Sequence, residues 1–390
     1  MDLSLTDEQT MIRDAAADVL AARSASADVR RALGQSGGRD DALWASLAGE
    51  LGWNALALPE AAGGMGLGAV EQALLLEQLG RRIACVPYFS TACVAATALA
   101  HCATPAACAW LANIAAGACS ATLALPIDMP FGAQPSTFIA KETADGYALS
   151  GVAEQVIDGA RADLLLIPAR IANEGRSVGL FAIEVGVARG LSATPLDVLD
   201  GTRPLARIAL DGVRVARDAS LAARDATPAL ERTAWFAALA LAAEATGGAQ
   251  QCLDLTLDYT SQRVQFGRAI ASFQAVKHRC AQMMVLIESA RSAVLGAAHA
   301  WDAQRGAAPD APLCADIAAA KATANDAFSF CAQEAIQLHG GVGFTWEYDP
   351  HLYFKRAQAS AAQFGTTPQL LEWIARHAID GSAERAGALQ

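Results

Sequence analysis

Gln262-Arg263-Val264-Gln265-Phe266-Gly267-Arg268 is the stretch of the sequence that is most informative about the fold. It lies in a C-terminal region of long Ala- and Leu-rich segments with helical periodicity, over residues 230–263, 271–303, 312–339 and 367–378. Gly267 and the pair Gly340-Gly341 interrupt these segments, as expected where helices end. Four antiparallel helices of this kind would form a bundle.

Short apolar runs replace the helical pattern in the middle of the chain. They occupy residues 121–125, 137–140, 147–149, 164–167, 178–183 and 207–215, and turn residues separate them. Asp145-Gly146 and Asp211-Gly212 are expected to form turns between strands. The pattern predicts a compact β domain that ends near Leu221.

The N-terminal residues again carry helical patterns. Thr6 stands three residues before Gln9, which is the spacing of an N-cap and its capping-box partner, and apolar pairs recur every fourth residue after it. Further helices are predicted over residues 43–51, 69–79 and 91–111. The expected class is α+β, with an N-terminal all-α domain (1–118), a middle β-barrel or β-sandwich domain (119–221) and a C-terminal four-helix bundle (222–390).

Composition and charge argue against several classes of protein. The chain has 390 residues, 53% of them hydrophobic, which is enough to bury large cores. Its net charge is −11 and it has no run of Lys or Arg, so nucleic acid is not an expected partner. A polyanionic substrate would have to be bound by local Arg or Lys side chains, because the charge of the whole protein repels it.

Two further features bear on the cellular compartment of the protein and on whether it spans a membrane. The nine cysteines are scattered among Ala and Leu without metal-ligand spacing, which indicates buried free thiols, a cytoplasmic protein and no metal site. Residues 83–127 contain no Asp, Glu, Lys or Arg, but Pro87 and Pro105 interrupt them and small side chains dominate. Helices buried in the protein are therefore expected there, and not a membrane span.

Three blocks in this α–β–α order resemble the acyl-CoA dehydrogenase family. They are Arg-x-x-Phe-Gly-Arg at 263–268, Ser-Phe-Gln-Ala-Val-Lys-His at 272–278 and Gln-Leu-His-Gly-Gly-Val-Gly-Phe at 337–344. The resemblance extends over essentially the whole chain. It implies FAD-dependent dehydrogenation of an acyl-CoA thioester to the 2,3-enoyl-CoA in fatty acid metabolism, with electrons passed to an electron-transfer flavoprotein. It also implies a homotetramer or an α2β2 heterotetramer.

The resemblance assigns the FAD contacts to these blocks and to the C-terminal segment. The residues concerned are Arg263, Gln265, Phe266, Gln337, Gly341 and Thr366. Residues at the positions of Arg263 and Phe266 contact the FAD of a neighbouring subunit in the family. A dinucleotide needs a cation for its pyrophosphate, a flat apolar surface and a place where backbone comes close. Alternatively, Arg263 caps a helix C-terminus and Gly340-Gly341 only ends a helix.

Dehydrogenation also requires a base for the α-proton. The family's usual carboxylate position near the C-terminus is Phe364 here, and its other position, early in the first bundle helix, is Ala237. Glu244 is a lone acid among small residues, and the pattern Ala242-Ala243-Glu244 resembles a subgroup of the family with the base glutamate on the first helix of the bundle. This resemblance implies Glu244 as the base, beside a face of Gly247 and Gly248 that could accept a thin ligand. Alternatively, Glu244 pairs with an Arg or Lys across a subunit interface and the glycines serve close helix packing.

The backbone N–H of Phe364 is expected, from the resemblance, to polarise the thioester carbonyl. Two other functions fit the same resemblance: a non-catalytic subunit that supports the FAD site of a paralogous partner, and a flavin oxidase or monooxygenase on the same fold. Three residues outside these sites have ordinary structural explanations. Asp158 is expected in a turn, with a contact to the flavin edge as the alternative. His339 is expected at a helix end and Trp346 in packing.

Overall fold

The computed structural model describes residues 3–102, 104–127, 137–172, 177–222, 225–304, 306 and 308–380. Its contacts group the chain into two compact units. The helical unit comprises Met1–Arg30, Ala69–Ala84 and Ala238–Gln390, and the β unit comprises Arg31–Gly68 and Cys85–Ala237. Two helices from the start of the chain therefore pack with the C-terminal helices.

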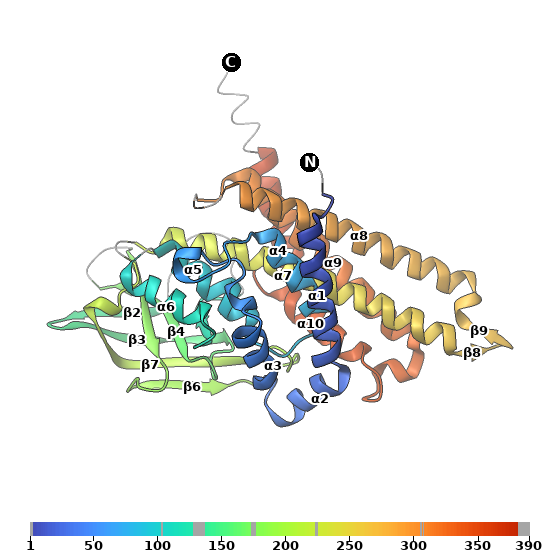
Figure 1. Cartoon of the computed structure of the whole chain (residues 1–390), viewed down its shortest axis with the longest axis horizontal. Coiled ribbons are helices and arrows are strands. Elements are labelled where there is room, and N and C mark those ends of the chain that lie inside the picture. Colours follow the sequence, from blue (N-terminus) through green and yellow to red (C-terminus); the bar gives the residue numbers. More distant parts are fainter. Residues whose placement is uncertain are drawn as a thin grey trace, which may run out of the picture. The chain divides into compact units, whose positions relative to one another are not determined.

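The helical unit is built from α1 (Asp7–Arg23), α4 (Ala69–Arg81), most of α7 (Thr227–Gln262), α8 (Gln274–Ala303), α9 (Ala311–His339), α10 (Pro350–Ala362) and α11 (Thr367–Ile374). Figure 1 shows α7, α8 and α9 running alongside one another, with a short hairpin of β8 (Val264–Gln265) and β9 (Arg268–Ala269) at one end. The capping box of α1 is confirmed, because Thr6 Oγ1 accepts from the Gln9 N–H at 3.2 Å and Gln9 Oε1 accepts from the Thr6 N–H at 3.1 Å.

The predicted long C-terminal helices are confirmed, but the prediction missed α10. This helix begins at Pro350, where the missing N–H costs nothing because the first N–H groups of a helix have no internal partner. Its buried side includes His351, Tyr353 and Arg356 as well as Leu352. Polar residues on the buried side conceal the apolar periodicity by which a helix is recognised in sequence.

The β unit contains one seven-stranded mixed sheet. Its strands are β1 (Ala121–Leu123), β2 (Phe138–Thr143), β3 (Gly146–Ile157), β4 (Leu164–Ile171), β5 (Val178–Glu184), β6 (Leu191–Pro195) and β7 (Leu205–Ala216). The order is β1-β4-β2-β3-β7-β6, and β5 pairs with β4. β1 and β2 run parallel to β4, and the other pairs are antiparallel. Phe138, Leu149, Phe181 and Ile208 lie in its core.

Two details of the sheet differ from the sequence prediction. Asp211-Gly212 is not a turn but a bulge inside β7: these two residues face Ser150 alone, between the pairs Leu149↔Val213 and Gly151↔Leu210. Gly212 takes φ +62, which a bulge of this type favours in glycine. The prediction also missed β6, because this edge strand is largely exposed and lacks alternating apolar residues.

The remaining helices of the β unit are short. They include α3 (Asp41–Ala45), η1 (Ser46–Glu50), η4 (Phe89–Ala95), α5 (Ala96–Cys102) and α6 (Pro105–Ala115), while α2 (Ser26–Gln35) spans the boundary of the units. The single helix predicted over 91–111 is wrong, because Thr104 starts a new helix by accepting from the Ala107 N–H at 3.2 Å. Within the described ranges, no helix is both long and apolar enough to cross a membrane.

The predicted class, α+β with helical, β and helical segments in that order, is confirmed. The prediction of buried thiols is right for Cys85, Cys93, Cys119, Cys252, Cys314 and Cys331. It is wrong for Cys108, which is exposed on α6. Cys102 and Cys280 are partly exposed.

Candidate active site

The ends of α7 and α9 meet at one end of the helical unit. Tyr259, in the last turn of α7, stacks on His339, the last residue of α9, with ring centroids 4.3 Å apart. Arg263 follows directly after α7, and Gly340 and Gly341 follow directly after α9. The tertiary structure therefore brings together the two sequence blocks that were predicted to bind FAD, although more than seventy residues separate them along the chain.

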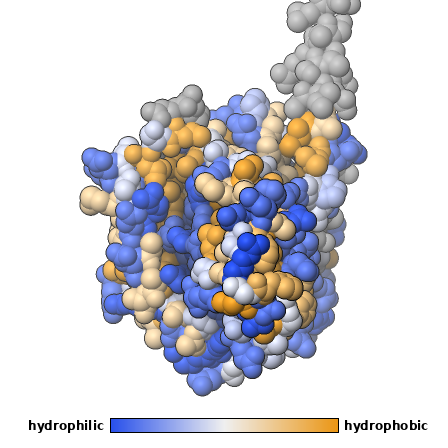
Figure 2. All heavy atoms as spheres, turned by 90° about the vertical axis from the view of Figure 1, so that its right-hand side faces the viewer, coloured by the Kyte–Doolittle hydropathy of each residue, from blue (hydrophilic) through white to orange (hydrophobic). Residues whose placement is uncertain are grey.

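Every predicted cofactor residue at this end is exposed. Arg263, Gln265, Gln337 and Gly341 are exposed, and Phe266 is 91% exposed. Val264, Phe344 and Trp346 add exposed apolar surface there. Figure 2, viewed from the side to which the hairpin points, shows hydrophobic areas lying among hydrophilic ones on this face. We call this set of residues the open end of the helical unit.

Phe266 is held outward by the hairpin turn. Phe266 and Gly267 have φ +54 and +78, the positive values that a two-residue hairpin turn of the primed type requires at both central positions. A bulky residue pays about 1–2 kcal/mol for this backbone conformation. Phe273 supports the turn, because its ring meets Phe266 edge-on at 6.1 Å and lies 4.0 Å from the Arg268 guanidinium. A strained backbone that exposes an aromatic ring is a feature expected at a ligand or subunit contact.

The residues at the open end fit the FAD assignment. In the described part of the chain, the Arg263 guanidinium has no hydrogen bond or ion pair, so it does not cap α7 as the alternative required. A Cβ added at Gly341 would meet nothing within 4 Å, so a ligand can approach its backbone. Gly340 ends α9 with φ +66 and ψ −146, a conformation restricted to glycine. The glycines therefore both end the helix and leave open space.

A second group of predicted residues, Phe364 and Thr366, lies in the turn between α10 and α11. Asn325 Nδ2 donates to the Gly365 carbonyl at 3.5 Å, which places this turn beside the middle of α9. Asn325 and Gln337 are twelve residues apart, so the turn and the open end are separated by about 18 Å along the helix axis. Thr366 starts α11, and its hydroxyl donates to Gln369 Oε1 at 2.9 Å.

Gln363, next to Phe364, provides an independent test of whether a ligand fits at this turn. Its side chain is 4% exposed, and its buried Oε1 atom has no hydrogen-bond partner among the described residues. An unsatisfied buried amide oxygen costs about 1–3 kcal/mol, so such atoms are found where another molecule supplies the hydrogen bond. This acceptor suits an N–H or O–H group of a flavin or of an acyl-CoA.

Glu244 is buried at 7% exposure and forms an ion pair with Arg356 of α10, which is 2% exposed. Both residues belong to the helical unit of the same chain, so the pair is internal and does not cross a subunit interface. A carboxylate removed from water requires such a partner. The ion pair with an arginine agrees with the alternative drawn from the sequence, except that the partner lies in the same chain and not across a subunit interface.

The glycine face beside Glu244 is closed by helix packing, so the prediction that it could accept a thin ligand is wrong. A Cβ on Gly247 would lie 1.8 Å from the Glu77 carbonyl oxygen of α4. A Cβ on Gly248 would lie 2.4 Å from the Phe328 ring of α9. These glycines allow α4 and α9 to approach α7 closely, which is the alternative explanation weighed from the sequence.

Three other residues singled out from the sequence have clear positions. Asp158 lies in a turn with φ +57 and accepts from the Ser90 hydroxyl at 2.6 Å, as a turn aspartate should. His339 ends α9, as predicted, and burial lowers the pKa of its imidazole. Trp346, predicted as a packing residue, meets the His351 ring edge-on at 4.8 Å and lies 5.0 Å from Lys355 Nζ, but it packs at the surface, where it is 67% exposed.

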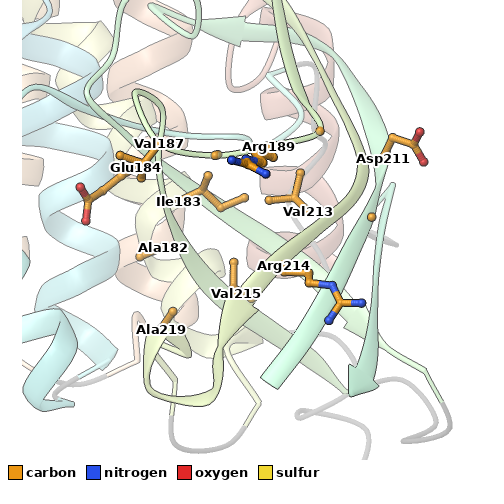
Figure 3. A pocket seen from close by; sticks show the side chains of 13 residues that line it. Ala182, Ile183, Glu184, Val187, Arg189, Asp211, Val213, Arg214, Val215 and Ala219 are labelled. Atoms are coloured by element: carbon orange, nitrogen blue, oxygen red, sulfur yellow. The ribbon is translucent and has the colours of Figure 1, made fainter. Parts of the chain in front are cut away.

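The β unit has a separate open cavity of about 640 Å³. It lies between the loop after β5 and the second half of β7. Figure 3 shows the Arg189 side chain between Ile183 and Val213, while Glu184 and Asp211 point outward on opposite sides. Its lining carries two arginines and two acids, so it has no net charge to select an anion. None of the predicted site residues lines it.

These features define a class: an α–β–α protein whose helical unit presents a cation, an aromatic ring and open glycines at one end. Comparison with known proteins identifies the family. Residues 6–118 match the family described as "Acyl-CoA dehydrogenase, N-terminal domain", and residues 229–379 match "Acyl-CoA dehydrogenase, C-terminal domain". The chain belongs to the acyl-CoA dehydrogenase family and is therefore an oxidoreductase that dehydrogenates acyl-CoA.

Individual relatives agree with this result. The chain is 34% identical to acyl-CoA dehydrogenase IpdE2 of Mycobacterium tuberculosis over 91% of this chain and 92% of that protein. Among solved structures it resembles the ChsE4-ChsE5 complex of Mycobacterium tuberculosis, with 28% identity, a TM-score of 0.85 and coverage of 97% and 98%. It also resembles the Tcur3481-Tcur3483 steroid ACAD, with 30% identity, a TM-score of 0.83 and coverage of 97% and 99%.

Proposed function

We propose that this chain binds FAD jointly with a neighbouring subunit and converts an acyl-CoA thioester to the 2,3-enoyl-CoA. The observation that carries the proposal is the open end, where Arg263, Gln265, Phe266, Gln337 and Gly341 converge and are exposed. Exposed residues of these types suit a group that a second subunit presents, in a homotetramer or an α2β2 heterotetramer.

The roles proposed for the chain's own residues follow from their chemistry. The Arg263 guanidinium pairs with the pyrophosphate, the Phe266 ring covers an apolar face, and Gln337 and the Gly341 backbone contact the adenosine half. The Phe364 N–H polarises the thioester carbonyl as enolate character develops, and Thr366 contacts the flavin. Bound FAD supplies the hydride acceptor, and an electron-transfer flavoprotein in the cytoplasm takes the electrons.

The cofactor proposal can be tested by purifying the chain and measuring its FAD content and affinity. A yellow protein that bleaches with an acyl-CoA under anaerobic conditions is the expected result. Arg263→Ala should lower FAD affinity at least tenfold, because it removes a charge-assisted contact worth about 1.5–3 kcal/mol. Arg376→Ala is the matched control, since Arg376 is also an exposed arginine but lies beyond α11, in the segment η8 (Ala375–Asp380). Equal FAD affinity in the two variants would contradict the proposed site.

Glu244 remains our proposal for the base when the chain works alone. It is the acid nominated by the sequence, and it lies in the helical unit that also holds the Phe364 turn. To accept the α-proton, its carboxylate must share or leave its contact with Arg356. Glu244→Asp and Glu244→Gln should both retain FAD, and only Glu244→Gln should lose roughly 10²-fold or more in turnover. Unchanged turnover in Glu244→Gln would eliminate Glu244 as the base.

The buried Glu244–Arg356 pair also favours a second candidate, a subunit of a heteromer whose partner chain supplies the base. In that case the ion pair is structural, and this chain contributes FAD contacts and the open end. The ChsE4-ChsE5 and Tcur3481-Tcur3483 relatives are each named as two components, which supports an α2β2 arrangement. Turnover that requires a co-expressed paralogue, together with full activity of Glu244→Gln in the complex, distinguishes this candidate from the first.

Substrate choice is best resolved with a panel of straight, branched, aromatic and steroid-derived CoA esters and an artificial electron acceptor. Steroid-derived esters are our first choice, because the Tcur3481-Tcur3483 relative is described as a steroid ACAD. The expected result is the highest kcat/KM for a ring-containing ester. A preference for short straight chains would contradict this choice without affecting the FAD proposal.

A further inference from the structure

A lysine and an asparagine are completely buried beneath the turn between α10 and α11. Lys321 of α9 is 0% exposed, and Asn325, one helical turn later, is 3% exposed. Lys321 Nζ donates to Asn325 Oδ1 and to the Ser360 carbonyl, the latter at 3.0 Å. Asn325 Nδ2 donates to the Gly365 carbonyl at 3.5 Å. The two side chains thus hold the backbone on both sides of Gln363 and Phe364.

Burial of the Lys321 ammonium group is energetically costly and needs compensating polar contacts. Removing a charge from water costs several kcal/mol unless polar partners replace the water. The Ser360 carbonyl is such a partner, because it lies in the last turn of α10, where helix carbonyls carry partial negative charge. A leucine or methionine would fill the same space in a helix core without this cost. Unlike these side chains, Lys321 can also hold the Ser360 carbonyl in place by a hydrogen bond.

The backbone that this pair holds is strained. Phe364 has φ +51 and Gly365 has φ +103. A bulky residue in the left-handed region costs about 1–2 kcal/mol, so the surrounding contacts must impose the conformation. Phe364 is also 2% exposed, so its ring is fixed in the interior. The direction of the Phe364 N–H is consequently set by buried contacts of the turn, and not by the preference of its own residue type.

We propose that Lys321 and Asn325 are positioning residues that orient the Phe364 N–H toward the thioester carbonyl. The inference rests on the proposed function, in which that N–H polarises the substrate. The two side chains do not touch the substrate in this proposal; they act through the Ser360 and Gly365 carbonyls. Polarisation depends on a donor placed within a few tenths of an ångström, and a misplacement of about 1 Å can cost roughly 10²-fold in rate.

The test compares the purified wild-type enzyme, with its partner chain if one co-purifies, with Lys321→Met and Asn325→Leu. Met283→Ala is the matched control, because it removes fully buried side-chain volume from α8 without altering the turn. Each protein is assayed for FAD content, melting temperature, kcat and KM. The carbonyl stretch of a bound, isotopically labelled acyl-CoA reports polarisation directly and does not depend on which chain supplies the base.

The expected result is a smaller shift of the carbonyl frequency in Lys321→Met and Asn325→Leu, with kcat reduced roughly ten- to hundredfold and KM changed less. Met283→Ala should lose a similar amount of stability and keep the wild-type shift. If Lys321→Met does not fold, Asn325→Leu, which leaves the lysine in place, decides the question. A wild-type shift in the folded variants would overturn the inference alone. A wild-type enzyme that binds no FAD, or shows no shift, would overturn the proposed function as well.

Discussion

The open end of the helical unit and its polar interior use the same residue types for opposite purposes. At the open end, Arg263 and Phe266 are exposed, and Gly341 borders empty space. In the interior, Arg356 and Phe364 are buried, and Gly247 is in contact with a neighbouring helix. Residue identity therefore does not reveal role in this protein. Substitutions at the open end should affect ligand binding, whereas substitutions in the interior should affect stability first.

The largest effect on stability is expected from the Glu244–Arg356 pair. Glu244→Gln and Arg356→Met should each lower the free energy of unfolding by about 3–5 kcal/mol, because each removes one charge of a buried ion pair. The double variant should lose less than the sum of the two. Urea denaturation of all three proteins measures the coupling. Additive losses, or single losses under about 1 kcal/mol, would show that the pair does not stabilise the interior as described.

A second contrast uses one substitution at two glycines. Gly247→Ala should destabilise the protein by about 1–3 kcal/mol, because its Cβ would lie 1.8 Å from a carbonyl oxygen and α4 must move. The better helix propensity of alanine, worth about 1 kcal/mol, offsets only part of this cost. Gly341→Ala should change stability by less than about 0.5 kcal/mol and reduce FAD affinity instead. Equal melting temperatures for the two variants would contradict the packing described for α4 and α7.

The third prediction concerns pH and uses His339, which is buried although it lies at the open end. Burial lowers the pKa of His339, against the opposing effect of its hydrogen bond with the Ala335 carbonyl. The unfolded chain therefore takes up this proton first as the pH falls. The resulting loss of stability begins near the ordinary pKa of about 6.5 and levels off below the folded value, with a slope of at most about 1.4 kcal/mol per pH unit.

Denaturation between pH 5 and 7.5 measures this slope, and His339→Gln should reduce it. His278→Gln is the control, because His278 is exposed at the start of α8. The comparison concerns slopes and not absolute stabilities, since His339→Gln also removes the stacking on Tyr259. An unchanged slope in His339→Gln would mean that another group dominates the response to acid.

The smallest effect on stability is expected at Phe266. Phe266→Ala should alter the free energy of unfolding by no more than about 0.5 kcal/mol, since the ring is 91% exposed and its turn is strained. It should nevertheless weaken FAD binding and subunit association. Met11→Ala, at a residue 69% exposed on α1, should change none of the three. A large loss of stability in Phe266→Ala would show that this ring contributes to packing as interior residues do. It would contradict the difference described between the open end and the interior.

The sequence was most reliable where a local rule acts alone. The capping box of α1, the long helices of the C-terminal region and the breaks at Gly267 and Gly340 all follow from residues close together in the chain. It failed where distant residues decide. The periodicity of α10 is concealed by polar residues that become buried only against other helices, and the bulge at Asp211-Gly212 depends on how β7 pairs with β3.

The candidate site divides in the same way. Arg263, Phe266, Gln337 and Gly341 were predictable as candidate cofactor residues, because their types and spacing resemble a family, and their role stays a prediction. The contacts of Glu244, Lys321 and Gln363 were not, because a buried ion pair, a buried ammonium and an unsatisfied amide are defined by neighbours far away in the chain. The one available signal for the lysine was a charged residue four positions before an asparagine in an Ala-rich helix.

The sequence by itself determined the order of helical, β and helical segments and the family, since periodicity and short motifs are properties of neighbouring residues. Only the tertiary structure decided that the open end faces solvent, that the glycines beside Glu244 serve packing, and that Lys321 and Asn325 lie beneath Phe364. The physical reason is that burial and pairing are long-range. A charge, a ring or a glycine acquires its role from what the folded chain places against it.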